Sequence, residues 1–222
     1  MEIKVQKNIM NRNNEIAAEN RQRFIDDGIF TVNVLASPGA GKTSVLLKII
    51  ETIDGKIDMA ILEGDIASQI DTDKIRKRGI PVMQINTGGG CHLDANMIRV
   101  SLSELKPAKN AIFLIENVGN LVCPSSHDLG ENMKLLIASV PEGHDKPYKY
   151  TSMFAAADAI ILNKTDLLPY IDFDKEVFYK GVHALKPDVP VFEMSCKTGD
   201  GVADFVNWLK DKRKLWQTQH TK

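Results

Sequence analysis

A glycine-rich loop, set between a β-like run and a helical pattern, constrains the fold of this chain more than any other feature. Residues 36–43 read Ala-Ser-Pro-Gly-Ala-Gly-Lys-Thr, after the apolar run of residues 31–36 and before the amphipathic residues 44–53. Small residues let the backbone wrap a polyphosphate so that its N–H groups and the helix N-terminus face the phosphate oxygens. The order of strand, loop and helix predicts a P-loop rather than a chance glycine-rich turn.

Each residue type in this loop has an expected task. Lys42 would reach the β- and γ-phosphates, and the Thr43 hydroxyl would ligate Mg²⁺. Ala36 stands at the first motif position, where glycine is usual, and the change is sterically modest because the tightest positions are still glycine. We expect the phosphates to be bound by Pro38, Gly39, Ala40, Gly41, Lys42, Thr43 and Ser44.

Short apolar runs recur along the chain and alternate with longer amphipathic segments. Runs that are buried on both faces and separated by helix-length segments indicate a mostly parallel sheet covered by helices, which is an α/β fold. The expected strands span residues 31–36, 59–62, 82–85, 111–115, 135–140, 159–162 and 191–194.

Further helical patterns lie near both ends. Residues 8–27 carry apolar side chains at near-helical spacing and are followed by Gly28, which suits the position after a helix. The pattern of residues 202–215 has a basic end, interpreted as cations that complement the dipole of the last helical turn rather than as a nucleic-acid patch. We expect one domain over residues 1–222, with an N-terminal helix (1–28), a core (29–201) and a C-terminal helix (202–222).

Composition excludes several classes of protein. The 222 residues carry 28 basic and 29 acidic side chains, a formal net charge of −1, so no global positive charge would draw nucleic acid or an anionic membrane. Three cysteines, an odd number at irregular spacing, argue against a disulfide framework and favour a reducing compartment. With neither a leader pattern nor an apolar stretch of about 18 residues, we expect a cytoplasmic protein.

Acidic residues follow two of the expected strands. Ligands in open α/β sheets bind beyond the carboxyl ends of the strands, so these side chains should face the P-loop. Asp65 is assigned to the Mg²⁺ shell, directly or through water, or to orienting the attacking water. Glu116 stands where a Walker-B acid would, and the Gly119 N–H could sense the γ-phosphate. The expected catalytic set is Lys42, Thr43, Asp65, Glu116 and Gly119; the alternative for the two acids is an ordinary capping role in a βα loop.

Residues 163–166, Asn-Lys-Thr-Asp, directly follow another expected strand. The Asp166 carboxylate can accept from N1–H and N2–H₂ of guanine, whereas adenine would leave this buried carboxylate unpaired. Lys164 would lie along the base, and Asn163 would brace the loop. A second segment, Ser195, Cys196 and Lys197, ends the last strand and could contact guanine O6 through backbone N–H groups. In this order the motifs predict a GTP-binding domain.

A possible metal site is separate from these motifs. Cys91 and His92 are adjacent and lead into the helical pattern of residues 94–105, and Cys123 follows Glu116 by 7 positions in the chain. Thiolate and imidazole suit Zn²⁺ or Ni²⁺, but three ligands are one short of a closed tetrahedral site. Water, a second copy of the chain or His127 could supply the fourth ligand. The alternative is that the cysteines are small buried apolar residues.

Several longer stretches resemble one family. They are Pro38 to Thr43, Asn86-Thr87-Gly88 leading into Cys91-His92-Leu93-Asp94-Ala95, Glu116-Asn117-Val118-Gly119-Asn120-Leu121-Val122-Cys123-Pro124, Glu142-Gly143 with Asp145-Lys146-Pro147, and Asn163-Lys164-Thr165-Asp166-Leu167-Leu168-Pro169. The combination, from about Gly28 to Gly201, is similar to the HypB family, the GTPases of [NiFe]-hydrogenase maturation. The stretch from Cys91 to Cys123 is more specific than any general GTPase motif. Urease accessory GTPases are similar overall but separate the Cys and the His by a proline.

The resemblance implies a P-loop NTPase of the SIMIBI type that works as a GTP-dependent homodimer. It would hydrolyse GTP slowly to GDP with Mg²⁺ and hand nickel to the hydrogenase large-subunit precursor, together with the partner HypA. By the same resemblance Cys91, His92 and Cys123 would hold Ni²⁺ or Zn²⁺ near the dimer interface. Lys146 matches a lysine-bearing segment that in the family lies near the nucleotide and the dimer contact. Many relatives also carry a Cys-rich or His-rich N-terminal nickel motif, which residues 1–27 do not contain.

Other functions fit part of the pattern. A urease-type or other metal-centre accessory GTPase would use the same motifs. A metal-binding scaffold would keep the nucleotide only to stabilise its fold. A P-loop kinase is opposed by Asp166, because guanine selectivity is unusual for such enzymes, and by the lack of an acceptor-binding lid. Because Glu116 and Cys123 belong to one short segment, a movement of the loop at Gly119 could alter the metal geometry directly.

Overall fold

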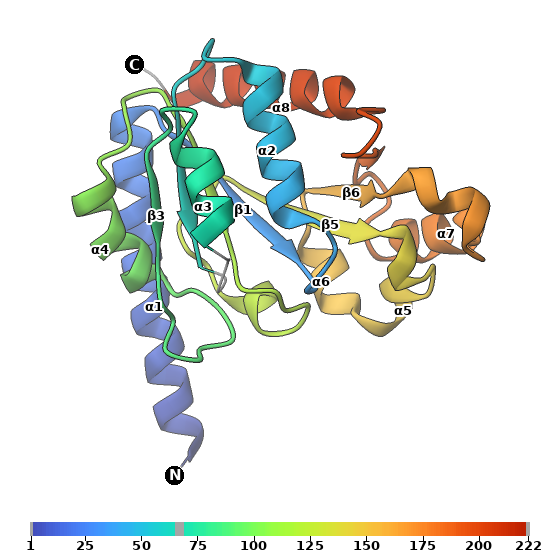
Figure 1. The fold of residues 1–222 in the computed structure, drawn as a ribbon. Helices are drawn as coiled ribbons and strands as arrows, with labels where there is room; N and C mark the ends of the chain where they lie inside the picture. Colours follow the sequence, from blue (N-terminus) through green and yellow to red (C-terminus); the bar gives the residue numbers. More distant parts are fainter. Residues whose placement is uncertain (1, 65–68, 221–222) are drawn as a thin grey trace.

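The computed structural model describes residues 2–64 and 69–220 (Figure 1). Within them lies one seven-stranded sheet of order β3-β2-β4-β1-β5-β6-β7, and every neighbouring pair is parallel. The strands are β1 (Phe30–Ala36), β2 (Met59–Glu63), β3 (Val82–Gln84), β4 (Ile112–Glu116), β5 (Met133–Ser139), β6 (Ala159–Asn163) and β7 (Val191–Glu193). Each expected apolar run is a strand, so the predicted α/β fold is confirmed.

Helices connect the strands and cover both faces of the sheet. The α-helices of the described residues are α1 (Glu2–Asp27), α2 (Lys42–Ile53), α3 (Gln69–Arg76), α4 (Ala95–Leu105), α5 (Lys146–Lys149), α6 (Thr151–Ala156), α7 (Lys175–Leu185) and α8 (Val202–His220). Short 3₁₀ turns are η1 (Cys123–Ser126), η2 (Val140–Glu142) and η3 (Thr165–Tyr170). Helices α2 and α8 pack together over one face, whereas α1, α4, α6 and α7 cover the other. None of the helices in the described part of the chain is both long and apolar enough to cross a bilayer.

Alternate residues of one strand supply the cores on opposite faces. On β4, Ile112 and Leu114 belong to the core under α2 and α8, whereas Phe113 and Ile115 belong to the core under α1 and α4. All four side chains are fully buried. Burial on both faces explains why the strands are continuous apolar runs rather than alternating patterns.

Helix α1 lies beside α4, and its N-terminal half projects beyond the sheet (Figure 1). It begins six residues before the predicted start and ends as expected, with Gly28 at φ 67°. Two buried amides anchor it. Asn13 donates to Asp128 O at 2.8 Å, and Asn20 donates to Ala95 O at 2.8 Å and Leu129 O at 3.1 Å. The helix therefore holds the two segments that follow the predicted metal ligands His92 and Cys123.

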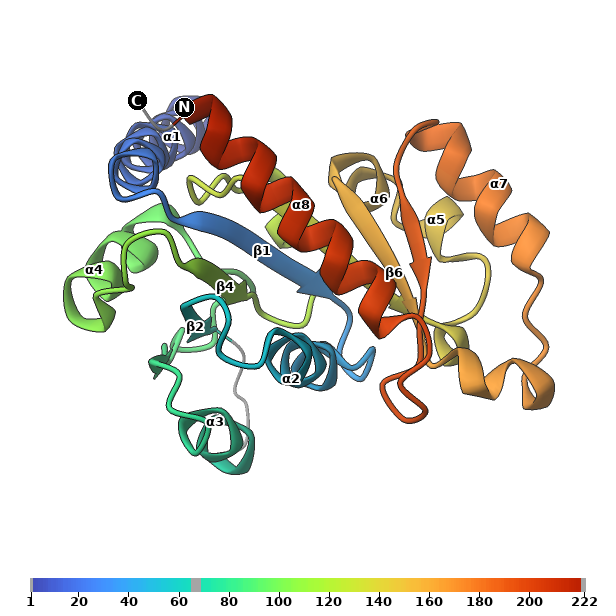
Figure 2. The same cartoon turned by 90° about the horizontal axis from the view of Figure 1, so that it is seen from above.

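Helix α8 differs from its prediction at its end. It continues to His220, so the basic residues at 210–214 lie inside the helix and do not complement its last turn as predicted. Packing explains the extra length, because Trp216 lies against Phe30 with ring centroids 5.8 Å apart. Gln217 also donates to Gly28 O at 3.0 Å, which ties the end of α8 to the end of α1 (Figure 2).

Candidate functional site

The P-loop joins the carboxyl end of β1 to α2, at the edge of the sheet where all parallel strands end. Gly39 and Gly41 have φ values of 79° and 102°, which L side chains rarely adopt. Gly41 is the N-cap of α2, which begins at Lys42, two residues before the expected start. A Cβ on Gly41 would lie 2.5 Å from Asn163 Nδ2, so only glycine fits between the P-loop and the end of β6.

The predicted Mg²⁺ ligands Thr43 and Glu116 lie in contact. Thr43 Oγ1 donates to Glu116 Oε1 at 3.0 Å, and the Glu116 side chain is almost fully buried at the end of β4. Hard carboxylate and hydroxyl oxygens at a phosphate loop fit Mg²⁺. Lys42 is buried at the first position of α2, and Gly119 lies in the loop that follows β4. Asp65 lies outside the described residues, so its role stays a prediction.

A second buried acid stands beside Glu116. Glu63, the last residue of β2, is the register neighbour of Glu116 and is fully buried. Thr72 Oγ1 donates to Glu63 Oε2 at 2.5 Å. Sequence reasoning passed over Glu63 in favour of Asp65, although its position as the last residue of a buried strand was a usable signal.

All the predicted base-binding residues except Ser195 line a cavity of about 540 Å³, within the usual range for small-molecule sites. Asn163 Nδ2 donates to Ala40 O at 3.0 Å, and Lys164 Nζ donates to Gly39 O at 2.7 Å, so both residues brace the P-loop. Asp166 accepts from Ser195 Oγ at 2.7 Å, which orients its carboxylate. Cys196 and Lys197 line the same cavity. Burial raises the pKa of the Cys196 thiol to about 11.

Helix α2 supplies one wall of the cavity. Of the residues in this wall, the sequence motif predicted only Ser44. Ser44, Leu47, Lys48 and Glu51 all line the cavity. Their spacing of three to four residues puts them on one helix face. Lys48 Nζ contacts Glu51 Oε2 at 2.8 Å. The helical period counted from Ser44 was the signal that could have found them.

Sequence reasoning also missed Glu142, which holds the P-loop through a hydrogen bond. Glu142, in η2 after β5, accepts a short hydrogen bond from the Ser37 hydroxyl. Its other oxygen accepts from Ser139 Oγ at 2.9 Å. Glu142 therefore holds the first turn of the P-loop to the end of the neighbouring strand. The sequence showed this residue only as part of a longer resemblance.

The predicted metal ligands come together at the same edge of the sheet. Donor atoms of Cys91, His92 and Cys123 all lie within 4.8 Å of one another. Cys91 Sγ and His92 Nδ1 are 3.4 Å apart, and bond lengths of about 2.0–2.3 Å would put tetrahedral ligands at roughly this separation. Cys91 and His92 lie in the loop directly before α4, which begins one residue after the expected start at residue 94, and Asp94 caps the helix. Cys123 is the first residue of η1.

His127 lies against this cluster. In the part of the chain that the structure describes, however, it is not one of the residues whose donor atoms come together there. Its ring centroid is 3.7 Å from that of His92, and its Nδ1 lies 2.9 Å from Cys123 O. Burial and the neighbouring His127 lower the pKa of His92, which favours the neutral imidazole that binds metals. The hydrogen bond with Cys123 raises the pKa of Cys91, so a metal must displace a proton there.

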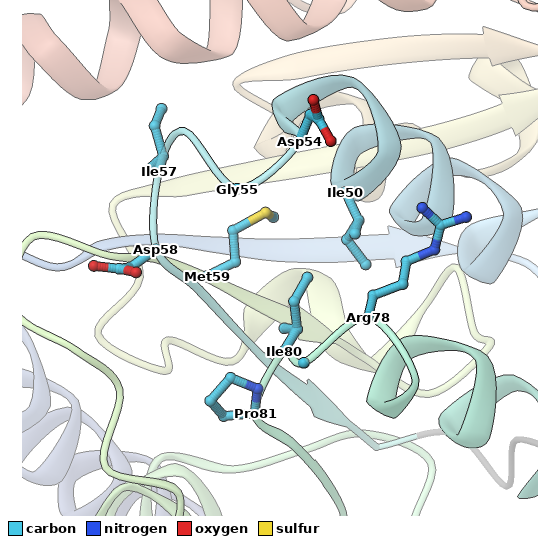
Figure 3. A pocket seen from close by; sticks show the side chains of 10 residues that line it. Ile50, Asp54, Gly55, Ile57, Asp58, Met59, Arg78, Ile80 and Pro81 are labelled. Atoms are coloured by element: carbon cyan, nitrogen blue, oxygen red, sulfur yellow. The ribbon is translucent and has the colours of Figure 1, made fainter.

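A smaller pocket lies at the opposite edge of the sheet (Figure 3). Its volume is about 230 Å³, and loops before β2 and β3 line it with Asp54, Asp58 and Arg78. Figure 3 shows these polar side chains around the apolar Ile50, Met59 and Ile80. None of its lining residues belongs to the predicted nucleotide or metal set.

Because the P-loop and the loop from Asn163 to Asp166 meet at one cavity, the fold and site define a P-loop nucleotide-binding protein. The family described as "CobW/HypB/UreG, nucleotide-binding domain" matches residues 30–193. The hydrogenase maturation factor HypB of Azotobacter vinelandii is 44% identical over 211 residues, covering 95% of this chain and 70% of that protein.

Solved structures agree with this match. HypB from Archaeoglobus fulgidus superimposes with a TM-score of 0.87 at 34% identity, covering 91% of this chain and 99% of that one. HypB from Helicobacter pylori in complex with nickel gives a TM-score of 0.84 at 38% identity, covering 92% and 96%. The chain belongs to the HypB family of hydrogenase maturation factors.

Proposed function

We propose that the chain binds and slowly hydrolyses GTP, and that the nucleotide controls a nickel ion carried by Cys91, His92 and Cys123 for hydrogenase maturation. The observation that carries this proposal is the short segment of residues 116–123. Its first residue, Glu116, contacts the P-loop Thr43, and its last residue supplies a thiol of the metal cluster. A nucleotide-dependent movement of this segment would alter both sites.

The phosphates would lie on the P-loop backbone from Pro38 to Ser44, with Lys42 at the β- and γ-phosphates. Bound Mg²⁺ would neutralise phosphate charge, and Thr43, Glu116 and Asp65 are the residues proposed to hold it directly or through water. Asp65 would alternatively orient the attacking water, and the Gly119 N–H would face the γ-phosphate. Transfer to water needs mainly positioning and charge stabilisation, so turnover without an added arginine should be slow.

Guanine selectivity would come from Asp166. The Ser195 hydroxyl holds one of its oxygens at 2.7 Å, and its side chain is only 15% exposed. A carboxylate held in this way would reject adenine, which has no N1–H or N2–H₂ to donate to it. Lys164 would lie along the base, while backbone N–H groups of Ser195, Cys196 and Lys197 would contact the guanine O6.

The cluster would exchange nickel because it is open. Its three ligands leave a coordination position for water, for a transferring ligand or for a second copy of the chain, and Zn²⁺ would suit the same donors. Cys91 is exposed, and the neighbouring Val122 is 59% exposed. We propose a GTP-dependent homodimer at this edge, with a HypA-type protein and the hydrogenase large-subunit precursor as partners and no nucleic-acid or membrane partner.

The proposal also covers the domain organisation of the chain and its cellular compartment. Residues 1–222 would act as one GTPase domain, with residues 1–28 as N-terminal helix, 29–201 as core and 202–222 as C-terminal helix. The single sheet of the described residues supports this division. The three cysteines are free thiols, which supports a reducing compartment such as the cytoplasm.

Nucleotide and nickel titrations test the proposal. The wild-type chain should bind GDP and GTP in preference to ATP and release phosphate, and Lys42→Ala should lose the hydrolysis. Cys91→Ala should lose nickel binding, while Cys196→Ala, which removes a thiol outside the cluster, should keep it. A chain that binds nickel but releases no phosphate from GTP would instead be a metal-binding scaffold with a structural nucleotide.

A further inference from the structure

Asn117 directly follows Glu116 and is almost fully buried at the end of β4. Its Oδ1 accepts two backbone hydrogen bonds, from Val118 N at 2.9 Å and from Leu93 N at 3.1 Å. Both partners are backbone N–H groups, which can only donate. The side-chain atom that they share must therefore be the amide oxygen of Asn117 and not its nitrogen. Val118 lies next to Gly119 in the proposed γ-phosphate loop, and Leu93 lies next to the metal ligand His92. One oxygen thus joins the two sites.

The other end of the Asn117 side chain is fixed as well. Asn117 Nδ2 donates to Asn33 Oδ1 at 3.1 Å, and Asn33 Nδ2 donates to Glu131 Oε1 at 3.1 Å. Glu131 Oε2 in turn accepts from Leu129 N at 2.7 Å. These buried amides and the carboxylate leave Asn117 little freedom to rotate, because each alternative would leave a buried polar group unpaired.

Leu93 has a second contact with the nucleotide side. A Cβ on Gly64 would lie 2.6 Å from Leu93 Cδ1, so Gly64 and the fully buried Leu93 are closely packed. Gly64 N also donates to Glu116 O at 2.7 Å. The backbone that carries His92 is therefore held both by the segment after β2 and by the segment after β4.

We propose that Asn117 is the positioning residue that couples the nucleotide state to the metal cluster, through the oxygen that Val118 N and Leu93 N share. The proposal rests on the proposed function and names its regulatory contact. Movement of Gly119 toward a γ-phosphate would displace Val118 N. Asn117 Oδ1 would then either lose one of its two hydrogen bonds or move together with Val118 N. In the second case Leu93, and with it His92, would shift to a new position. The two arrangements are the alternative states that coupling requires.

The chain offers a matched control at Asn20. Its buried amide donates to Ala95 O and Leu129 O, so it ties α1 to the segment that follows His92 and to the segment that follows Cys123. Within the described part of the chain, the Asn20 side chain makes no hydrogen bond with the loop after Glu116. Asn20→Ala should therefore weaken the fold without touching the shared oxygen, whereas Asn117→Ala removes that oxygen.

Nickel affinity is measured with GDP and with a non-hydrolysable GTP analogue, using the thiolate-to-nickel absorption of the full chain. We expect the wild-type affinities to differ about 5-fold or more between the two states. Asn117→Ala should reduce this ratio to about 2-fold or less and still bind nucleotide and nickel, whereas Asn20→Ala should keep the wild-type ratio. The inference is overturned if Asn117→Ala keeps the ratio, or if Asn20→Ala loses it equally.

Hydrogen exchange of the wild-type chain tests the same contact if Asn117→Ala does not fold. The GTP analogue should change amide protection in residues 91–95 together with residues 117–122. Unchanged protection in residues 91–95 would overturn the inference. Failure of the proposed function is distinct, because the wild type would then bind no GTP, or would bind no nickel through Cys91. Equal nickel affinity in both states, with both ligands bound, overturns only the coupling.

Discussion

Replacing Gly41 by alanine should damage the P-loop in two separable ways. The first is backbone strain, because φ at Gly41 is 102° and such conformations cost L residues about 1–3 kcal/mol. The second is a collision, because the new Cβ would lie 2.5 Å from Asn163 Nδ2. Asn163 would have to release Ala40 O, which it now holds at 3.0 Å. Leaving that buried carbonyl unpaired costs about 1–3 kcal/mol more.

The expected loss in the free energy of unfolding is therefore about 2–6 kcal/mol, a large part of the roughly 5–15 kcal/mol of a typical domain. Gly39→Ala is the matched control, because Gly39 also has a positive φ of 79° but a Cβ there meets no atom within 4 Å. It should lose only the strain, about 1–3 kcal/mol. Urea unfolding of the nucleotide-free chain, followed by circular dichroism, measures both losses.

Asn163→Ala completes a double-mutant cycle. If the collision is the cause, Gly41→Ala should cost about 1–3 kcal/mol less in the Asn163→Ala background than in the wild type. The reasoning is refuted if Gly41→Ala and Gly39→Ala lose the same free energy, or if the cost of Gly41→Ala is independent of Asn163.

Three further outcomes are expected. Asp166→Asn should reverse the donor pattern at the base and favour xanthosine triphosphate over GTP by about 100-fold or more in competition binding; continued preference for GTP would contradict the guanine assignment. Gly64→Ala should lower the free energy of unfolding by about 1–3 kcal/mol, because its Cβ would collide with buried Leu93, and Leu93→Ala should relieve the loss; a neutral Gly64→Ala in urea unfolding would refute this packing. Since burial raises the pKa of Cys196 to about 11, only about 0.1% of this thiol is ionised at pH 8, against about 20% of an ordinary one. Iodoacetamide should therefore modify Cys196 about 100-fold more slowly in the folded than in the urea-unfolded chain, with a rate that rises with pH up to about 11, and equal rates by mass spectrometry would be inconsistent with the buried thiol.

The fold was predictable because its signals are local. The apolar runs, the P-loop and the glycine after α1 depend on side-chain period and backbone freedom, which neighbouring residues decide. Element ends were less accurate. Helix α8 runs to His220 because Trp216 packs on Phe30, a contact between residues far apart in the chain.

In the candidate site, too, the local motifs were predictable and the contacts between distant residues were not. Contiguous motifs marked Thr43, Asp166 and Cys91, since phosphate, base and metal each need particular residue types at fixed spacing. Hydrogen bonds between residues far apart in the chain could not be predicted, so the one from Ser37 to Glu142 was missed.

The sequence by itself determined an α/β P-loop chain with guanine-type and Cys/His motifs, because the groups proposed to bind phosphate, base and metal lie in short continuous segments. Only the tertiary structure decided how those segments meet. The Asn117 oxygen joins Val118 to Leu93 because β4 ends beside the loop that carries His92. Such a bond depends on strand order and register, which the packing of the whole sheet sets and no single segment encodes.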